Sequence, residues 1–211
     1  SIGFSSQSRD NSNNNITNNN FYNFLNPSIS SKGIIIGSSN LEWIISGNSF
    51  FETTTFNTTS SASYEIISVS LGSSDNILIE NNYIGGNSPS ASGTWLKTGN
   101  NNSFIGISYG SFSVYAGTIK NNSIRNFNWT NNGSSTFTGI HLTSGLATIS
   151  NNTIGATTGI GSIIFTSGAS GSNLYGILNS STSLNAAIIS NNSIGSLTTA
   201  TSSSTDAANI I

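Results

Sequence analysis

One six-residue motif recurs six times along the chain, and it limits the possible fold more than any other feature of the sequence. The motif reads Ile-x-Asn-Asn-x-Ile, with small variations. The first position is always Ile and the fourth is always Asn, whereas the last position holds Phe in two copies and Ile in four. The copies begin at Ile16, Ile45, Ile79, Ile119, Ile149 and Ile189. Apolar and polar residues at such fixed offsets indicate a stack of similar structural units.

A second motif, Gly-Ile in most copies, alternates with the first. Its isoleucines are predicted to form a further column, at Ile34, Ile66, Ile107, Ile140, Ile177 and Ile210. Successive Asn pairs are 29, 34, 40, 30 and 40 residues apart, so that longer and shorter turns alternate over most of the chain. The extra length of the long turns lies at about 86–102 and 156–172, where small residues and glycine predict loops.

The residue types of the repeat favour strands over helices. Strong helix formers are scarce, whereas short runs rich in β-branched Ile are bounded by Gly, Asn and Ser. A parallel β-helix satisfies this pattern, because each coil adds one strand to each of two or three parallel sheets. We therefore predict an all-β, right-handed parallel β-helix (β-solenoid) of about six coils, with insertion loops in alternate coils. It is expected to form a single segment over 1–211, with an irregular lead-in at 1–14, and to belong to a longer repeat array.

The Asn pair is predicted to make a sharp corner between two sheets. One residue at such a corner takes a positive φ, which Asn tolerates better than most residues that carry a side chain. Stacked side-chain amides can donate to and accept from the coils on either side, which keeps buried polar groups satisfied. The residue after the first Ile should point outward, so Glu80 and Lys120, in adjacent coils, should be neighbours on the surface. The predicted ladder consists of Asn19, Asn48, Asn82, Asn122, Asn152 and Asn192.

These coils resemble the right-handed parallel β-helix family, best known from pectate lyases and related carbohydrate-active proteins. The segments ISNNTIGATTGIGS, NLYGI and IISNNSIG are more closely similar to long repeat proteins of Bacteroidota that are exported to the cell surface and are adhesin-like. The resemblance covers nearly the whole chain from about Asn15. It implies the fold and a place at the cell surface, but no activity, because the matching residues are structural.

Composition excludes several classes of function. Charged residues make up 6% of the 211 residues and the net charge is −2, which excludes a typical nucleic-acid binder. No run of about 18 apolar residues is present, so no membrane insertion is predicted. The chain has no Cys and therefore neither a disulfide framework nor a thiolate metal site. We predict no cofactor and no bound metal.

The acidic residues do not form a predicted catalytic cluster. Glycoside hydrolysis needs two carboxyl groups about 5–9 Å apart. No two acids hold the same position in adjacent coils; they are Asp10, Glu42, Glu52, Glu65, Asp75, Glu80 and Asp206. The single histidine, His141, has no Ser/His/Asp arrangement around it. The segment is therefore not predicted to be an enzyme.

Aromatic residues are the candidates for ligand contact. Trp95, Trp129 and Trp43 are predicted to lie in or near loops and corners, where an exposed ring could stack on a sugar. The alternative is that these rings cover the core where loops fold back. A flat array of threonines would indicate ice binding, and the candidates lie at 53–55, 58–59 and 198–201. They do not recur once per coil as a regular column.

The functional hypothesis is a structural, extracellular segment of a bacterial surface adhesin or filament, acting as a rigid rod with contacts made by its loops. Its expected partners are neighbouring repeats of the same chain, further copies of itself and surface polysaccharide. The lack of Cys and Met suits an oxidising exterior. The first alternative is a carbohydrate-binding or polysaccharide-cleaving β-helix, and the second is an ice-binding solenoid.

Overall fold

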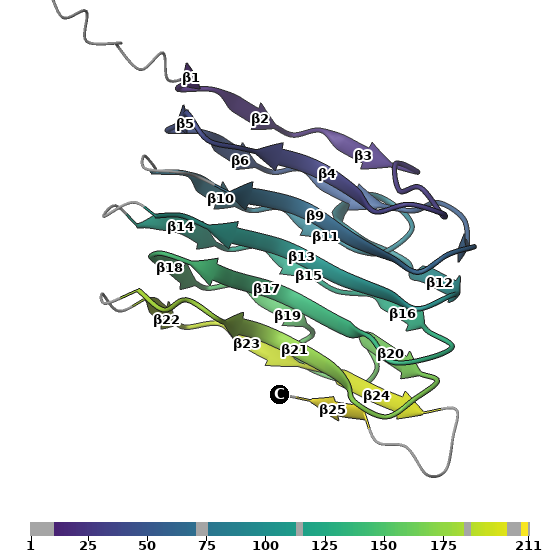
Figure 1. The fold of residues 1–211 in the computed structure, drawn as a ribbon. Coiled ribbons are helices and arrows are strands. Elements are labelled where there is room, and N and C mark those ends of the chain that lie inside the picture. Colours follow the sequence, from purple (N-terminus) through teal and green to yellow (C-terminus); the bar gives the residue numbers. More distant parts are fainter. Residues whose placement is uncertain (1–10, 71–75, 113–115, 184–186, 202–207, 211) are drawn as a thin grey trace, which may run out of the picture.

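The chain winds into a stack of coils built almost entirely of strands (Figure 1). The computed structural model describes residues 11–70, 76–112, 116–183, 187–201 and 208–210. Each strand pairs in parallel with the equivalent strands of the coils before and after it. The only helical piece of this described part is a 3-10 turn, η1 (Pro89–Ala91). The predicted fold class, a parallel β-solenoid with strands stacked coil on coil, is confirmed.

The coils contribute strands to four sheets, one more than the largest number predicted. Sheet 1 contains β2 (Asn15–Thr17), β6 (Ile44–Ser46), β10 (Leu78–Glu80), β14 (Gly117–Lys120), β18 (Ala147–Ser150) and β22 (Ile188–Ser190). Sheet 2 contains β3 (Asn20–Tyr22), β7 (Ser49–Phe51), β11 (Tyr83–Ile84), β15 (Ser123–Ile124), β19 (Thr153–Gly155) and β23 (Ser193–Gly195). The Asn pairs connect these two sheets.

The return path of each coil forms the other two sheets. Sheet 3 contains β8 (Phe56–Thr58), β12 (Trp95–Gly99), β16 (Phe127–Thr130), β20 (Ile163–Ser167) and β24 (Leu197–Thr201). Sheet 4 contains β4 (Ser31–Ile36), β9 (Ala62–Ser70), β13 (Asn102–Gly110), β17 (Thr136–Ser144), β21 (Ser172–Asn179) and β25 (Ala208–Ile210). At the N-terminal end of the stack, β1 (Asn11–Ser12) pairs with β5 (Asn40–Leu41).

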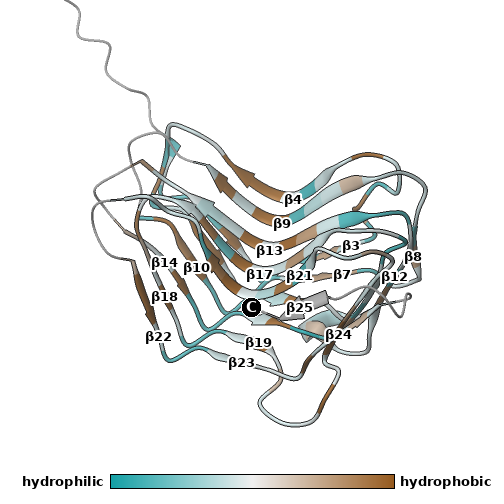
Figure 2. Cartoon of the chain, turned by 60° about the horizontal axis from the view of Figure 1, so that its bottom comes forward, coloured by the Kyte–Doolittle hydropathy of each residue, from teal (hydrophilic) through white to brown (hydrophobic). Residues whose placement is uncertain are grey.

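The interior is filled by columns of equivalent apolar residues, because successive side chains of a strand point to opposite faces. Figure 2 shows the resulting alternation of apolar and polar segments along the strands. Full burial of one such side chain contributes roughly 1.5–3 kcal/mol to folding. The first and last positions of the repeat motif in the four central copies are 0% exposed: Ile45, Phe50, Ile79, Ile84, Ile119, Ile124, Ile149 and Ile154.

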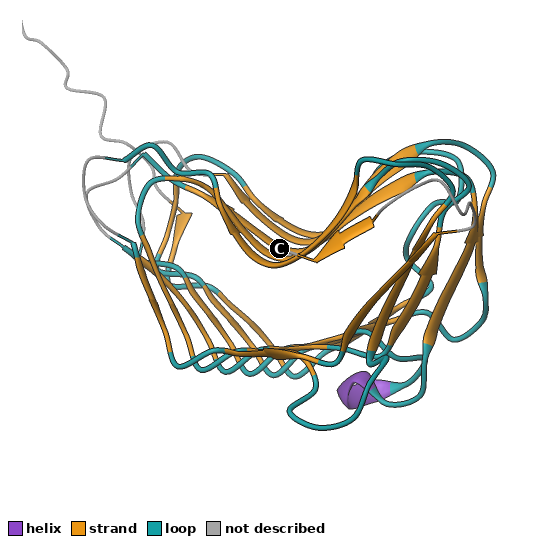
Figure 3. Ribbon diagram, turned by 90° about the horizontal axis from the view of Figure 1, so that it is seen from below, coloured by secondary structure: helices purple, strands orange, loops and turns teal. Residues whose placement is uncertain are grey.

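Sheet 4 bends toward the interior, so that the coil is concave on this side (Figure 3). A column of residues without a side chain lies at the bend: Gly33, Gly106, Gly139 and Gly176. A Cβ at Gly139 would lie 2.6 Å from the main-chain oxygen of Gly176 and 3.0 Å from Cγ2 of Ile154 on sheet 2. Glycine at position 139 therefore avoids a clash with the main chain of the next coil in the same sheet and with a side chain of sheet 2.

Two details of the predicted second column are wrong. In the second coil, Ile67 and not Ile66 pairs with Ile34 and Ile107. Ile66 instead occupies the glycine column, where it is fully buried. At the C-terminal end, Ile210 pairs with Leu174, three residues before the expected partner. The first error follows from aligning the motif by sequence alone, because Ile66 lies in the column of the bend, where the other coils hold glycine. The second is a difference of register, because β25 pairs with the first residues of β21, before the bend.

The insertion loops occur in alternate coils as predicted, but they are shorter than expected. The segments 86–102 and 156–172 each include a strand of sheet 3, namely β12 and β20. The actual insertions join sheet 2 to sheet 3 at 85–94, which contains η1, and at 156–162. The intervening coil crosses the same corner with residues 125–126 alone.

Replacing Gly139 with Ala tests the close approach at the bend. We expect Gly139→Ala to reduce the free energy of unfolding by about 1–3 kcal/mol, because the main chain of the next coil occupies the new methyl group's space. Urea unfolding followed by circular dichroism measures the loss. The control is Gly37→Ala, because nothing lies within 4 Å of a Cβ at Gly37. Equal effects of the two variants would contradict the steric explanation.

Candidate functional site

The predicted asparagines form one continuous hydrogen-bonded ladder through the stack. The main-chain N–H and the side-chain Nδ2 of each asparagine both donate to Oδ1 of the asparagine in the next coil. The ten donor–acceptor distances are 2.9–3.1 Å. Asn48, Asn82, Asn122 and Asn152 are at most 1% exposed. The predicted asparagine stacking is confirmed.

The ladder amides of the second to sixth copies also bond in the opposite direction, whereas Nδ2 of Asn19 donates to the main-chain oxygen of Thr17 in its own coil. Nδ2 of Asn82 donates to the main-chain oxygen of Ile45, at 2.8 Å, and Nδ2 of Asn122 donates to that of Ile79, at 2.9 Å. The amide therefore uses one hydrogen toward the preceding coil and one toward the following coil. A single asparagine thus joins three successive coils, which satisfies a polar group that would otherwise be costly to bury.

The other residue of the pair makes the turn between sheets 1 and 2. The first residue of each pair has a φ of 55–56° in the five copies that hold Asn there: Asn18, Asn81, Asn121, Asn151 and Asn191. In the remaining copy the position holds Gly47, whose φ is 69°. The two asparagines therefore have separate roles, since one provides the left-handed turn and the other provides the ladder.

The tryptophans proposed for ligand contact lie mostly in the core, so that proposal needs correction. Trp95 and Trp129 are 0% exposed, and neither ring offers a face to a sugar. Trp95 begins β12 and points inward, instead of lying in a loop. Its ring stacks on Phe127, with centroids 5.2 Å apart, and Phe104 packs between these rings and Phe137.

Trp43 is the third candidate, and it lies just before β6. Its ring is partly buried against the core, and its Nε1 donates to the main-chain oxygen of Asn11, at 3.1 Å. This bond joins the first two coils near the N-terminal end of the stack. Trp43 therefore packs against the core, as the alternative prediction for the aromatic rings stated.

Lys97 is a buried cation that the sequence analysis did not single out. It occupies an inward position of β12, is 0% exposed and lies in register with Phe56 and Trp129. Its Nζ donates to the main-chain oxygens of Asn100 and Thr130 and to Oδ1 of Asn131. The ammonium also lies 5.5 Å from the centroid of the Trp129 ring. Burial lowers the pKa of Lys97 to about 7.

Among the described residues, four charged side chains of the surface form two separate pairs. Lys120 and Glu80 lie 3.3 Å apart on the outer face of sheet 1, as predicted. Lys32 and Glu65 lie 3.1 Å apart on the outer face of sheet 4. Each exposed pair stabilises the fold by at most about 1 kcal/mol.

The acidic residues do not meet at one site within the described part of the chain. Glu52 is buried, accepts from the main-chain N–H of Leu25 and has a pKa that burial raises. Asp10, Asp75 and Asp206 lie outside the described residues. The described part contains no group of three His, Cys, Asp or Glu side chains that could hold a metal ion.

His141 lies on the concave outer face of sheet 4, in register with Ser108 and Leu178. Its Nε2 is 3.0 Å from Oγ of Ser180, so that the ring is hydrogen-bonded. Partial burial lowers the pKa of His141, and the charge of Glu65 opposes this shift. Among the described residues no carboxylate is hydrogen-bonded to the ring, so that His141 and Ser180 are not completed to a nucleophile–base–acid series.

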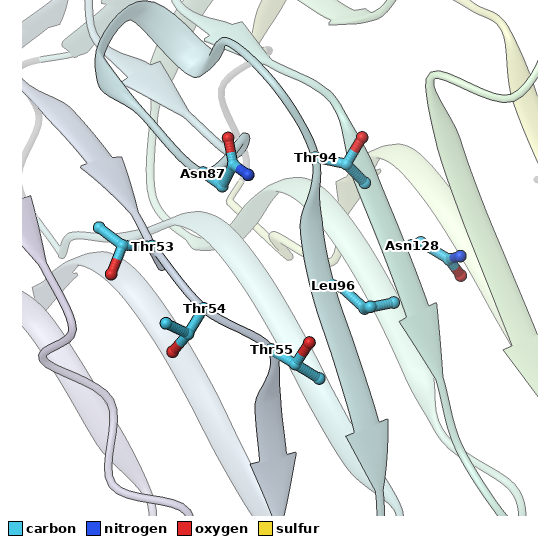
Figure 4. A pocket seen from close by; sticks show the side chains of 7 residues that line it. All are labelled: Thr53, Thr54, Thr55, Asn87, Thr94, Leu96 and Asn128. Carbon is cyan, nitrogen blue, oxygen red and sulfur yellow. The ribbon is translucent and has the colours of Figure 1, made fainter.

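One surface hollow is lined mostly by small polar residues. The hollow in Figure 4 has a volume of about 380 Å³ and lies where the 85–94 loop meets sheet 3. Its lining consists of Thr53, Thr54, Thr55, Asn87, Thr94, Leu96 and Asn128. The lining contains no aromatic ring and no charged group, so that it offers hydroxyl and amide contacts alone.

A short threonine row, which the sequence analysis missed, runs along the outer face of sheet 3. Thr130 pairs with Thr166. Thr98 lies beside Thr130, because these two threonines directly follow the paired residues Lys97 and Trp129. The row ends at Asn57 on one side and at Ala200 on the other. It escapes notice in the sequence because insertions of different length precede its members.

Comparison of the chain with protein-family models, with curated proteins and with solved structures gave no match. Within the described residues, no helix is both long and apolar enough to cross a membrane. The candidate site is therefore defined by geometry alone, and its most extensive feature is the asparagine ladder.

Substituting either residue of one Asn pair by Gly separates the two roles. We expect Asn122→Gly to lower the free energy of unfolding by at least about 2 kcal/mol, because two buried donors of Asn82 lose their acceptor. Asn121→Gly is the matched control. It should have little effect, because Gly tolerates the positive φ and Gly47 already stands at this position in another copy. Thermal unfolding measures both, and equal losses would contradict the division of roles.

The lowered pKa of the buried Lys97 predicts an unusual dependence of stability on pH. The pKa is about 7 in the folded chain and 10.5 in an unperturbed lysine, so that the unfolded chain binds more protons between these values. The free energy of unfolding should therefore rise from pH 7.5 to pH 9.5, below the range in which Tyr64 titrates. Urea unfolding at several pH values measures the slope. Lys97→Met should remove it, and a flat profile of the natural chain would contradict the prediction.

Proposed function

We propose that the chain is a structural, extracellular segment of a bacterial surface adhesin or filament, and that it serves as a rigid rod. The observation that carries this proposal is the uninterrupted asparagine ladder, which links six coils through ten hydrogen bonds of 2.9–3.1 Å. A stack that is bonded at every step resists bending and stretching along its axis. The rod keeps its ends apart and presents its loops at fixed heights.

The core supports the same proposal. Large rings of successive coils contact one another through the centre of the stack, as Phe104 does with Phe137 at 4.6 Å and Phe137 with Phe165 at 6.2 Å. Aromatic contacts of this kind add about 0.5–1.5 kcal/mol beyond the area that they bury. The largest side chains are therefore used for cohesion between coils.

The carbohydrate alternative finds less support among the described residues. A sugar-binding site commonly joins an exposed aromatic face to polar side chains, whereas Trp95 and Trp129 are buried. The hollow at Thr53–Thr55 supplies hydroxyl groups without a ring. We retain surface polysaccharide as a partner of the loops, and we assign no cleavage to the chain. We also assign no ice-binding function, because the threonine row of sheet 3 spans three coils.

Immunolabelling of whole cells tests the proposed location. Antibodies against the chain should label intact cells of the bacterium that produces it, as strongly as they label permeabilised cells. Labelling that requires permeabilisation would place the protein inside the cell and contradict the proposal. A glycan array and a reducing-sugar assay in parallel test the alternative, because tight binding or cleavage of a polysaccharide would favour it.

Single-molecule pulling tests the mechanical role. With handles on the first and last coils, the natural chain should unfold in steps of about one coil. Asn122→Gly should lower the force of the step that opens its coil, whereas Asn121→Gly should leave that force unchanged. Gradual extension of the natural chain at low force would contradict a rod function.

A further inference from the structure

The interior of the stack holds one amine against one side-chain amide of the next coil. Nζ of Lys97, on β12 of the third coil, lies 2.5 Å from Oδ1 of Asn131, which directly follows β16 of the fourth coil. Both side chains are buried, so that bulk water does not separate the two groups. The carbonyl carbon of the amide is one bond away from the oxygen that Nζ contacts. The fold thus keeps the two groups close enough for the amine to attack the amide.

The ammonium form of Lys97 has no charged partner among the described residues. The acceptors around Nζ are the main-chain oxygens of Asn100 and Thr130 and the amide oxygen of Asn131, all of which are uncharged. Burial lowers the pKa of Lys97 to about 7, so that a large share of this lysine is a free amine at neutral pH. A lysine that is desolvated in this way is an activated nucleophile.

The amide of Asn131 is prepared for attack at both of its ends. Oδ1 accepts from the main-chain N–H of Asn102, at 2.9 Å, so that a fixed donor faces the oxygen on which negative charge develops. Nδ2 lies 2.5 Å from Oγ of Ser135, whose hydroxyl can rotate to donate a proton to the departing nitrogen. Ser135 also lines a surface hollow of about 410 Å³, so that the departing group is close to solvent.

We propose that Lys97 and Asn131 form an isopeptide bond, without another protein, that joins the third and fourth coils covalently. Nζ attacks Cγ of Asn131, a bond from Nζ to Cγ forms, and the bond from Cγ to Nδ2 breaks. Nζ gives up one proton and Nδ2 gains one through Ser135, so that the nitrogen leaves as ammonia. The step needs no oxidant, reductant or further reactant. This inference does not rest on the proposed rod function.

The bond strengthens a side of the stack that the asparagine ladder does not reach. The ladder joins the coils between sheets 1 and 2, whereas Lys97 lies on sheet 3. The neighbouring coils hold Phe56, Trp129 and Phe165 in the same inward column, so that the amine occurs at one step of this column. A covalent link between two coils reduces the conformational entropy of the unfolded chain and thereby raises stability.

Mass spectrometry of the intact chain tests the proposal. After incubation at about pH 9, where the amine form of Lys97 predominates, the folded chain should be lighter than its sequence by the mass of one ammonia. Proteolysis should then release one branched peptide in which Lys97 is joined to Asn131. A folded chain that keeps its full mass would overturn the proposal. Loss of ammonia without the branched peptide would also overturn it, because an asparagine can lose ammonia by cyclising on its own main chain.

Variants identify the reacting groups. Lys97→Met and Asn131→Ala should each keep the full mass, and circular dichroism checks that they fold. The matched control is Asn132→Ala, at the exposed neighbour of the reacting asparagine, which should still lose one ammonia. Loss of ammonia by Lys97→Met would overturn the proposal. Ser135→Ala should slow the reaction about tenfold or more, because the departing nitrogen loses its proton donor, and an unchanged rate would overturn that role.

Unfolding and titration give two further readouts. The natural chain held in urea should keep its full mass, because the reaction depends on the proximity that the fold provides. The pH dependence of stability predicted for Lys97 is that of the chain before the bond forms, and it should disappear once the amine has become an amide. Failure of either result would contradict the isopeptide bond, whereas the labelling and pulling experiments would still report on location and stiffness.

Discussion

The hydrogen bond between one asparagine amide and the next sets the height of every coil. Neighbouring strands of a sheet lie about 4.7–4.9 Å apart. The side-chain amide fits this interval, since Oδ1 accepts from the coil before while Nδ2 donates to the coil after. A coil that rose by more or less would break the amide bonds and the strand pairing together. The corner between sheets 1 and 2 therefore acts as the fixed reference from which the rest of each coil departs.

The opposite side of the coil tolerates much more variation. One inward column of sheet 3 holds Phe56, Lys97, Trp129 and Phe165, a mixture that would be disruptive at the ladder. The lysine is accommodated because two main-chain oxygens and one amide oxygen surround its ammonium. Sheet 4 adapts in another way, by bending until its glycine column meets sheet 2. Strict repetition at one corner thus permits irregular packing elsewhere.

The parts of the structure that repeat with a constant offset could be predicted from the sequence. The ladder, the columns around it and the pair Glu80–Lys120 are of this kind, because each follows directly from the position of a residue within the motif. Features on the far side of the insertions could not be placed. Whether Ile66 or Ile67 aligns with Ile34 depends on the bend of sheet 4. The burial of Trp95 depends on where the 85–94 loop ends. Lys97 gave no signal at all, because a cation at an inward position contradicts the pattern that sequence reasoning uses.

The insertions lie apart from the residues that hold the coils together. The loops at 85–94 and 156–162 leave the stack at the same corner, two coils or roughly 10 Å apart. Neither loop includes a ladder residue or a residue of sheets 1 and 2. A substitution at an exposed loop position such as Ile160, which is 94% exposed, can alter the displayed surface without changing the cohesion of the coils. In the 85–94 loop, by contrast, Ala91 is buried and the main-chain N–H of Ser90 donates to Oγ of Ser49 on sheet 2. The exposed positions of the loops can therefore vary in sequence, and with them the surface that the protein presents, whereas the ladder asparagines cannot.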